Sequence, residues 1–189
     1  MIHNKDNAYK NSYSKLINEL KYRGVKNTTV LSLLQHDWPS SEKILRNLTN
    51  HLSSGFFDEN GRVVLVEIVT KALKAYECTI HSDNRIRAND HERMCIFLEA
   101  LISATCHYMQ IKAVDNKTAE IWTISNKESF TQWVKQRSNH IEIVENHFDD
   151  ERLTRAKLYE KVVTKSVKDL FREYKYEDSI VDGNLGTCS

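Results

Sequence analysis

Residues 58–67, with the sequence DENGRVVLVE, include residue types that a helix–loop–helix calcium site uses. Such a loop has oxygen ligands at positions 1, 3, 5 and 12, and a glycine at position 6. With Gly61 at position 6, Asp58 and Glu67 fall at ligand positions, but Phe56 falls at position 1 and has no side-chain oxygen. We therefore expect no tight calcium site and interpret the segment as a turn that leads into a helix.

Histidine and cysteine recur along residues 91–107 at spacings that could hold a metal ion. His91 and Cys95 are one helical turn apart, and Cys106 and His107 follow on the same predicted helix. Along a helix axis Cys95 and Cys106 are about 16 Å apart, whereas the ligands of one zinc ion lie roughly 2.0–2.3 Å from it. The four side chains cannot share one ion, so we expect buried reduced thiols and no zinc site.

Acidic residues gather between residues 142 and 151, beside two histidines. Carboxylate-bridged metal sites in helix bundles use paired Glu-x-x-His motifs, which this segment lacks. Glu142 and Glu145 have that spacing, with the wrong second residue. We interpret the segment as a solvated helix end, with acids placed favourably at the N-terminus of the next helix.

Sequence motifs of common enzymes are missing from the chain. It has no G-x-S-x-G, no Walker A and no G-x-G-x-x-G sequence, and we expect no cofactor. An interaction module is therefore favoured over an enzyme. An enzyme whose site is assembled from dispersed His, Asp and Glu residues on helices stays open as an alternative.

The composition favours helices as the elements that position these side chains. The 189 residues include 5 glycines and 1 proline, with 40% hydrophobic and 28% charged residues. Such values are typical of a soluble globular protein, and so few chain breakers leave little for the turns of a β-rich fold. We predict an all-α protein of about seven helices, with a single compact domain over residues 7–175 and a flexible tail over residues 176–189.

Apolar residues three and four apart predict the first helices. These helices cover residues 7–22, 29–36, 41–53 and 62–79, the third of them capped by Ser40 or Ser41. A central apolar helix is predicted near residues 91–112, because Glu99 is the only formally charged residue between 94 and 111. Its core residues are expected to be buried: Met94, Phe97, Leu98, Leu101 and Tyr108.

The C-terminal part of the chain is also predicted to be helical. Ser125 and Glu128 have the spacing of a capping box ahead of one helix. A second helix is predicted over residues 139–148, and a long final helix over 150–174 after a cap at Asp149 or Asp150.

The long final helix carries the predicted partner-binding residues. Its apolar stripe has the spacing of helix-in-groove anchors. We expect the partner to be another protein or a second copy of this chain, although the same stripe could instead pack inside the monomer. The stripe consists of Leu153, Val163, Val167, Leu170 and Tyr174.

A helix-turn-helix DNA-binding regulator is the second alternative, placed on residues 28–50. Residues 1–55 hold eight Lys or Arg and four acidic residues, an excess of four. The second helix of this unit offers Lys43, Arg46 and Asn47 as readers, and Pro39 stands where a tight glycine turn is more usual. We therefore expect no nucleic-acid partner.

The chain is expected to be cytoplasmic. Its first residues lack the apolar stretch of a secretory signal, and its 4 cysteines are sparse, which is typical of reduced thiols. Residues 94–111 contain polar side chains, so we expect burial of this segment in a soluble core and no membrane span.

Overall fold

The computed structural model describes residues 39–52, 64–82, 90–137, 140–148 and 150–183. The helices predicted over 7–22 and 29–36 lie outside the described residues, as does the loop before residue 64 that contains most of the calcium-like motif.

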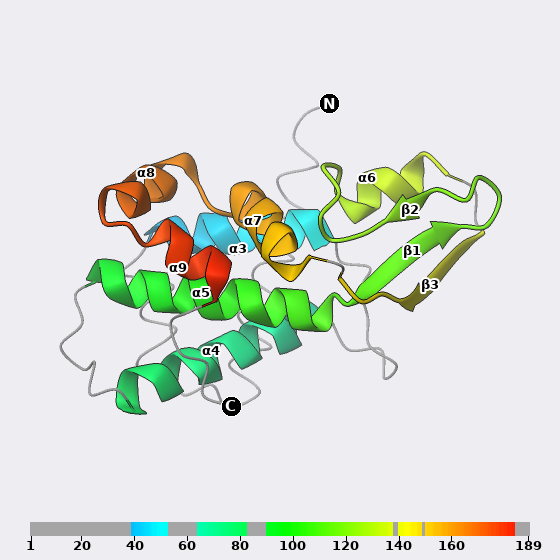
Figure 1. Cartoon of the computed structure of the whole chain (residues 1–189). Coiled ribbons are helices and arrows are strands. Elements are labelled where there is room, and N and C mark those ends of the chain that lie inside the picture. The colour runs from blue at the N-terminus through cyan, green and yellow to red at the C-terminus, as the bar shows by residue number, and fades with distance from the viewer. Residues whose placement is uncertain (1–38, 53–63, 83–89, 138–139, 149, 184–189) are drawn as a thin grey trace.

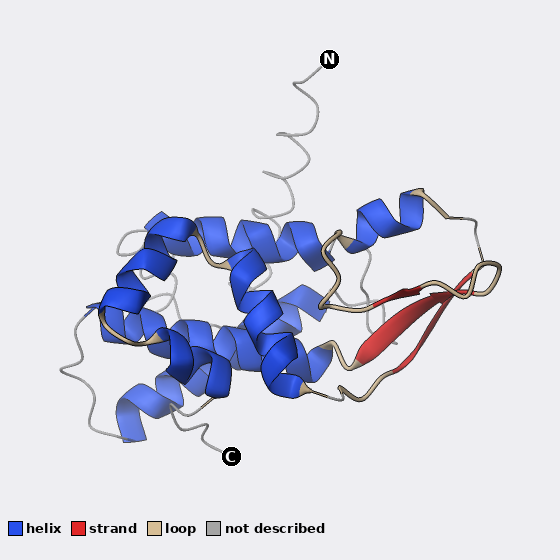
Figure 2. Cartoon of the chain, turned by 45° about the horizontal axis from the view of Figure 1, so that its top comes forward, coloured by secondary structure: helices blue, strands red, loops and turns tan. Residues whose placement is uncertain are grey.

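The first three described helices match predicted segments. They are α3 (Pro39–Leu52), α4 (Val64–Ser82) and α5 (Asp90–Tyr108). Together with three helices near the C-terminus they form a helical body, in which α5 lies between α4 and the later helices α7 and α9 (Figures 1 and 2).

The core prediction for α5 is confirmed at four of its five residues. Met94 is 8% exposed and Leu101 is 0% exposed, and Phe97 and Leu98 are likewise buried. The prediction that Tyr108 is buried is wrong, because this last residue of α5 is 36% exposed. The Lys71 ammonium lies 5.5 Å from the centroid of its ring.

The all-α prediction is wrong, because the chain also forms a small antiparallel sheet. Its strands are β1 (Ile111–Asp115), β2 (Ile121–Trp122) and β3 (Ile141–Glu145), in the order β2-β1-β3. The predicted central helix thus ends before Ile111, and the segment 139–148 contains a strand. Over so short a distance its apolar residues fit both the period of a helix and that of a strand. Pairing with β1 decides that the segment forms a strand.

The sheet projects from one end of the helical body, next to the short helix α6 (Phe130–Lys135) (Figure 1). In both views α6 lies on the β2 side of the sheet, and β3 forms the other edge (Figure 2). The capping box predicted at Ser125 is wrong by four residues. The box is formed by Ser129 and Gln132, whereas Ser125 bonds to Thr123 in the preceding turn.

The long helix predicted over 150–174 is two helices. α7 (Glu151–Val162) begins after Asp150, whose carboxylate accepts a hydrogen bond from the Leu153 amide at 2.8 Å, so the predicted cap is confirmed. α8 (Lys165–Glu173) begins after Thr164. Val163 and Thr164 are extended, because β-branched residues tolerate that conformation well and Thr164 is a favourable residue at a helix start.

Part of the predicted flexible tail is a packed helix. α9 (Glu177–Asp182) follows α8, and its Ile180 and Val181 are buried. Gly183 ends α9 in the left-handed conformation, with φ of 72°, which glycine adopts without steric cost. A segment this short shows no period in the sequence, so its docking depends on contacts with α5 and α7.

Candidate functional site

The five predicted partner-binding residues do not form one stripe. Val163 and Val167 are only 4% and 3% exposed, and Leu170 is partly buried against the core. Leu153 and Tyr174 are 49% and 46% exposed, but the first lies in α7 and the second caps α8. The break at residues 163 and 164 divides the stripe, and its middle packs inside the chain.

A different surface is open at strand β3. The Asn116 amide donates to the His140 carbonyl at 3.0 Å, and the Asn146 amide donates to the Gln110 carbonyl at 2.9 Å. Residues of an antiparallel strand alternate between the two edges, so positions 140, 142, 144 and 146 face β1. The backbone groups of Ile141, Ile143 and Glu145 therefore point away from the sheet, and we call them the β3 edge.

The β3 edge has no partner strand among the described residues. It offers one N–H donor and one carbonyl acceptor at each of its three residues. An unpaired strand edge of this kind is a template for another strand, and natural proteins use such edges to bind extended peptides.

A row of apolar side chains runs across the three strands of the sheet and ends at the β3 edge. Ala113 is paired with Trp122 on one side and with Ile143 on the other, so the three side chains share one face of the sheet. Trp122 is 0% exposed, Ala113 is 1% exposed, and Ile143 is 48% exposed. A further strand beside β3 would add a residue to the row and cover Ile143.

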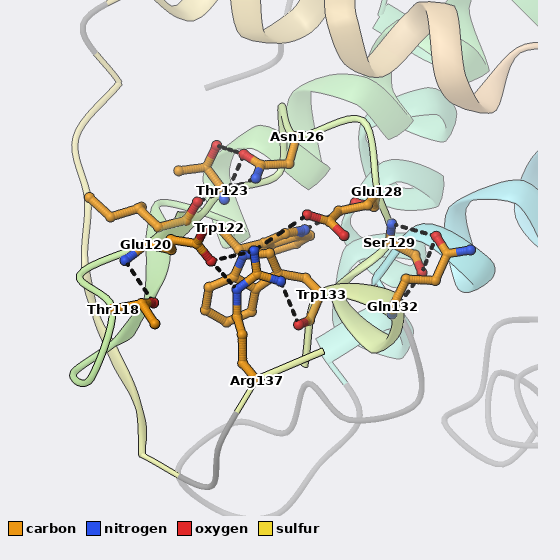
Figure 3. A network of polar contacts seen from close by, with 11 residues as sticks. Thr118, Glu120, Trp122, Thr123, Asn126, Glu128, Ser129, Gln132, Trp133 and Arg137 are labelled. Carbon is orange, nitrogen blue, oxygen red and sulfur yellow. Dashed lines mark hydrogen bonds and ion pairs between the residues drawn. The ribbon is translucent and has the colours of Figure 1, made fainter. Parts of the chain in front are cut away.

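The opposite edge of the sheet is held by α6 (Figure 3). The Arg137 guanidinium lies 4.5 Å from the centroid of the Trp133 ring, and its Nε donates to Glu120 at 2.7 Å. Trp122 donates through Nε1 to the carbonyl of Glu128 at 3.1 Å. These contacts join β2 to α6, so the sheet is a supported platform for β3.

The predicted metal-spacing residues do not form a metal site. His91 packs against Tyr174 at a centroid distance of 5.1 Å, Cys95 is buried, and His107 is exposed. Burial raises the pKa of Cys106 to about 12, which leaves its thiol unreactive at neutral pH. Among the described residues, no three His, Cys, Asp or Glu side chains are placed to hold one ion.

The acidic segment lies on a strand and a helix start, and not at a helix end. Glu142 and Glu145 are exposed on β3. Asp150 and Glu151 begin α7, where negative charge favours the exposed amides of the first turn.

Two basic side chains, one from α3 and one from α7, have buried nitrogen atoms: the His51 side chain is buried, and Lys161 is half-buried with a buried Nζ. His51 Nε2 is 2.8 Å from the Ile124 carbonyl, which requires the imidazole to donate there. The pKa of His51 is lowered to about 4, mainly by burial and in part by the charge of Lys161, while the hydrogen bond to Ile124 opposes the shift. Burial and the charge of Lys157 lower the pKa of Lys161 to about 8, and its Nζ is buried without a hydrogen-bond partner in the described structure.

A second buried polar contact joins α5, α7 and α9. Arg155 Nη2 is 3.3 Å from Glu99 Oε1 and donates to the Ile180 carbonyl at 2.9 Å, while Nε donates to the Val181 carbonyl at 3.0 Å. Burial raises the pKa of Glu99, and Arg155 opposes that shift. Its partners are other groups of the fold, so this contact holds helices together.

The residues proposed to read DNA are placed poorly for that task. Asn47 donates to the Val162 carbonyl at 2.9 Å and so contacts α7. The helix that carries these residues, α3, packs into the core through Ile44, Leu45 and Leu48. Of the three predicted readers only Lys43 is exposed, and residues 28–38 of the unit lie outside the described part.

The sequence held signals for some of these features. IEIVE at residues 141–145 has two isoleucines two positions apart and is rich in β-branched residues, which is typical of a strand. Glu99, alone in an apolar helix, signals a buried cationic partner. The positions of His51 and Lys161 carry no comparable signal.

Comparisons with protein-family models, with curated proteins and with solved structures found no match for the chain. No helix in the described residues is long and apolar enough to cross a membrane.

Proposed function

We propose that this protein is an interaction module, and that it binds another polypeptide as an added strand along the β3 edge. The observation that carries the proposal is that, within the described part of the chain, β3 is paired on one side only, with Ile143 48% exposed at the end of an otherwise buried row. Backbone hydrogen bonds supply affinity in this mode, and the exposed side chains select the sequence.

The architecture around β3 supports this function. Only two residues separate the end of α5 from the start of β1, and α6 packs against the Trp122 side of the sheet. A rigid platform lowers the entropic cost of ordering the site when a peptide binds.

The proposal is tested by hydrogen exchange with peptides selected from a random ten-residue display library. In the free protein, the amides of Ile141, Ile143 and Glu145 should exchange quickly, whereas those of Glu142 and Val144 should be protected by β1. A selected peptide should slow exchange at the first three positions. Fast exchange that persists there, or protection already present in the free protein, would contradict the proposal.

A matched pair of variants tests the role of the side chain. Ile121 on β2 is 48% exposed, like Ile143, so Ile121→Ser and Ile143→Ser remove similar exposed apolar surface. Peptide affinity should fall in Ile143→Ser and stay near the original value in Ile121→Ser. The reverse order, or an equal loss in both, would place the peptide elsewhere.

A further inference from the structure

We propose that the strand accepted by the β3 edge is basic and apolar, with two Lys or Arg residues three positions apart. This inference rests on the proposed function, because it names the partner of the same edge. It is carried by the two carboxylates that stand on β3 on either side of the central pair Ile143 and Val144.

Glu142 and Glu145 lie on opposite faces of the sheet, since they are an odd number of residues apart. Glu142 is paired with Val114 and Glu145 with Ile111 across β1, so neither has a cation directly opposite. Both side chains are exposed. Glu142 Oε2 accepts a hydrogen bond from the side-chain amide Nδ2 of Asn116 at 3.2 Å, and no ion pair with a described residue involves either carboxylate.

The register of an added strand follows from the β3 edge. An antiparallel partner would form its hydrogen-bonded pairs with Ile141, Ile143 and Glu145. Read from its N-terminus, the partner then places successive residues opposite positions 145, 144, 143, 142 and 141. Cations opposite the two carboxylates and apolar residues elsewhere give the pattern Lys-Φ-Φ-Lys-Φ, in which Φ is apolar and Arg can replace Lys.

A second copy of this chain fits the edge less well. In a symmetric antiparallel pair centred on Ile143, Glu142 lies opposite Val144 of the other copy, and the two Glu142 side chains become diagonal neighbours. Diagonal positions in such a pair are about 7–8 Å apart, so the like charges repel each other and remain without cations. The basic strand relieves this charge at both positions.

The test uses three synthetic peptides with a common frame. The first is Thr-Lys-Val-Ile-Lys-Val-Thr, the second replaces both Lys by Glu, and the third is Thr-Lys-Lys-Val-Ile-Val-Thr, which keeps the composition of the first and loses the spacing. Affinities are measured by NMR titration of the amide signals of β3 at low salt. The first peptide should bind roughly ten-fold more tightly than the second, because two attractive cross-strand charge pairs become repulsive in the second peptide. It should also bind more tightly than the third.

Charge reversal provides the matched control. In the double variant Glu142→Lys/Glu145→Lys the order of the first two peptides should invert, and high salt should weaken the preference in both proteins. Equal binding of all three peptides with protection of the β3 edge would overturn this inference and leave strand addition standing. If neither these three peptides nor any peptide from the library protects the β3 edge, the result would count against strand addition itself. Dimerisation without peptide, lost in Ile143→Pro, would make a second copy the occupant.

Discussion

Arg155 on α7 and Glu99 on α5 form an ion pair inside the helical body, with side-chain exposures of 5% and 4%. Arg155 also donates to Ser103 Oγ at 3.1 Å and to two carbonyls near the end of α9. Removing one partner of a buried pair leaves the other charge without compensation. The guanidinium therefore joins three helices through its contacts.

We expect Arg155→Ala to lower the free energy of unfolding by about 3–5 kcal/mol, the usual cost of breaking a buried ion pair from one side. Denaturant titration measures the loss. Arg152→Ala is the control, because Arg152 also joins α7 to α9 through Asp182, although its side chain is 68% exposed. Its effect should be much smaller, and similar losses in both variants would contradict the special role of Arg155.

Leu101 is expected to contribute strongly to stability, because its side chain is 0% exposed at the centre of α5. Leu101→Ala should cost about 2–5 kcal/mol through lost burial and the cavity that remains. Leu153→Ala makes the same chemical change at a position that is 49% exposed and should be nearly neutral. A loss below roughly 1 kcal/mol for Leu101→Ala would refute the central position of α5.

His51 should make the protein sensitive to mild acid. Its pKa is about 4 in the folded chain and 6.5 as the reference value, so the neutral ring is favoured by folding. The stabilisation is complete above pH 6.5 and is lost as the pH falls toward 4. Between pH 7 and 5 the wild type should lose about 2 kcal/mol more than His51→Gln, whose amide can still donate to Ile124. Parallel pH curves for the two proteins would show that another group is responsible.

Lys161 should destabilise the fold at neutral pH. Its pKa is lowered from 10.5 to about 8, so folding favours the neutral amine. The contribution to stability is greatest above pH 10.5 and falls as the pH drops through 8. Lys161→Met should therefore raise the melting temperature at pH 7, with a smaller gain at pH 10. The same change at Lys74, which is exposed on α4, serves as the control. A lower melting temperature in Lys161→Met at both pH values would indicate that the ammonium has a counter-charge.

The helices of the body could be predicted where apolar spacing persists for several turns. α4 has about four turns of such spacing, and α5 is apolar on nearly every side over a similar length, which is typical of a buried helix. Over 141–145 the pattern is too short to separate a helix from a strand. The pairing of this segment with β1 decides that it forms a strand. That contact joins segments about thirty residues apart, and local periodicity carries no information about it.

The candidate site was harder to predict than the core, because it depends on which backbone groups and side chains are left without a partner after the chain has folded. Val163 and Val167 belong to the same apolar series as Tyr174, and only the break after Val162 shows which of them face inward. Similarly, the spacing of Ile141 and Ile143 indicates a strand, yet the lack of a neighbouring strand beyond it among the described residues is a property of the assembled sheet.

The docking of α9 sets an order of events during synthesis on the ribosome. Arg155 obtains two of its acceptors from Ile180 and Val181, which are added to the chain 25 and 26 residues later. Until those residues leave the exit tunnel, the guanidinium keeps its hydration, and α5 and α7 cannot close around it in their final arrangement. α9 is therefore the helix that completes the burial of the charge, and the helical body reaches its final packing only after Ile180 and Val181 have emerged.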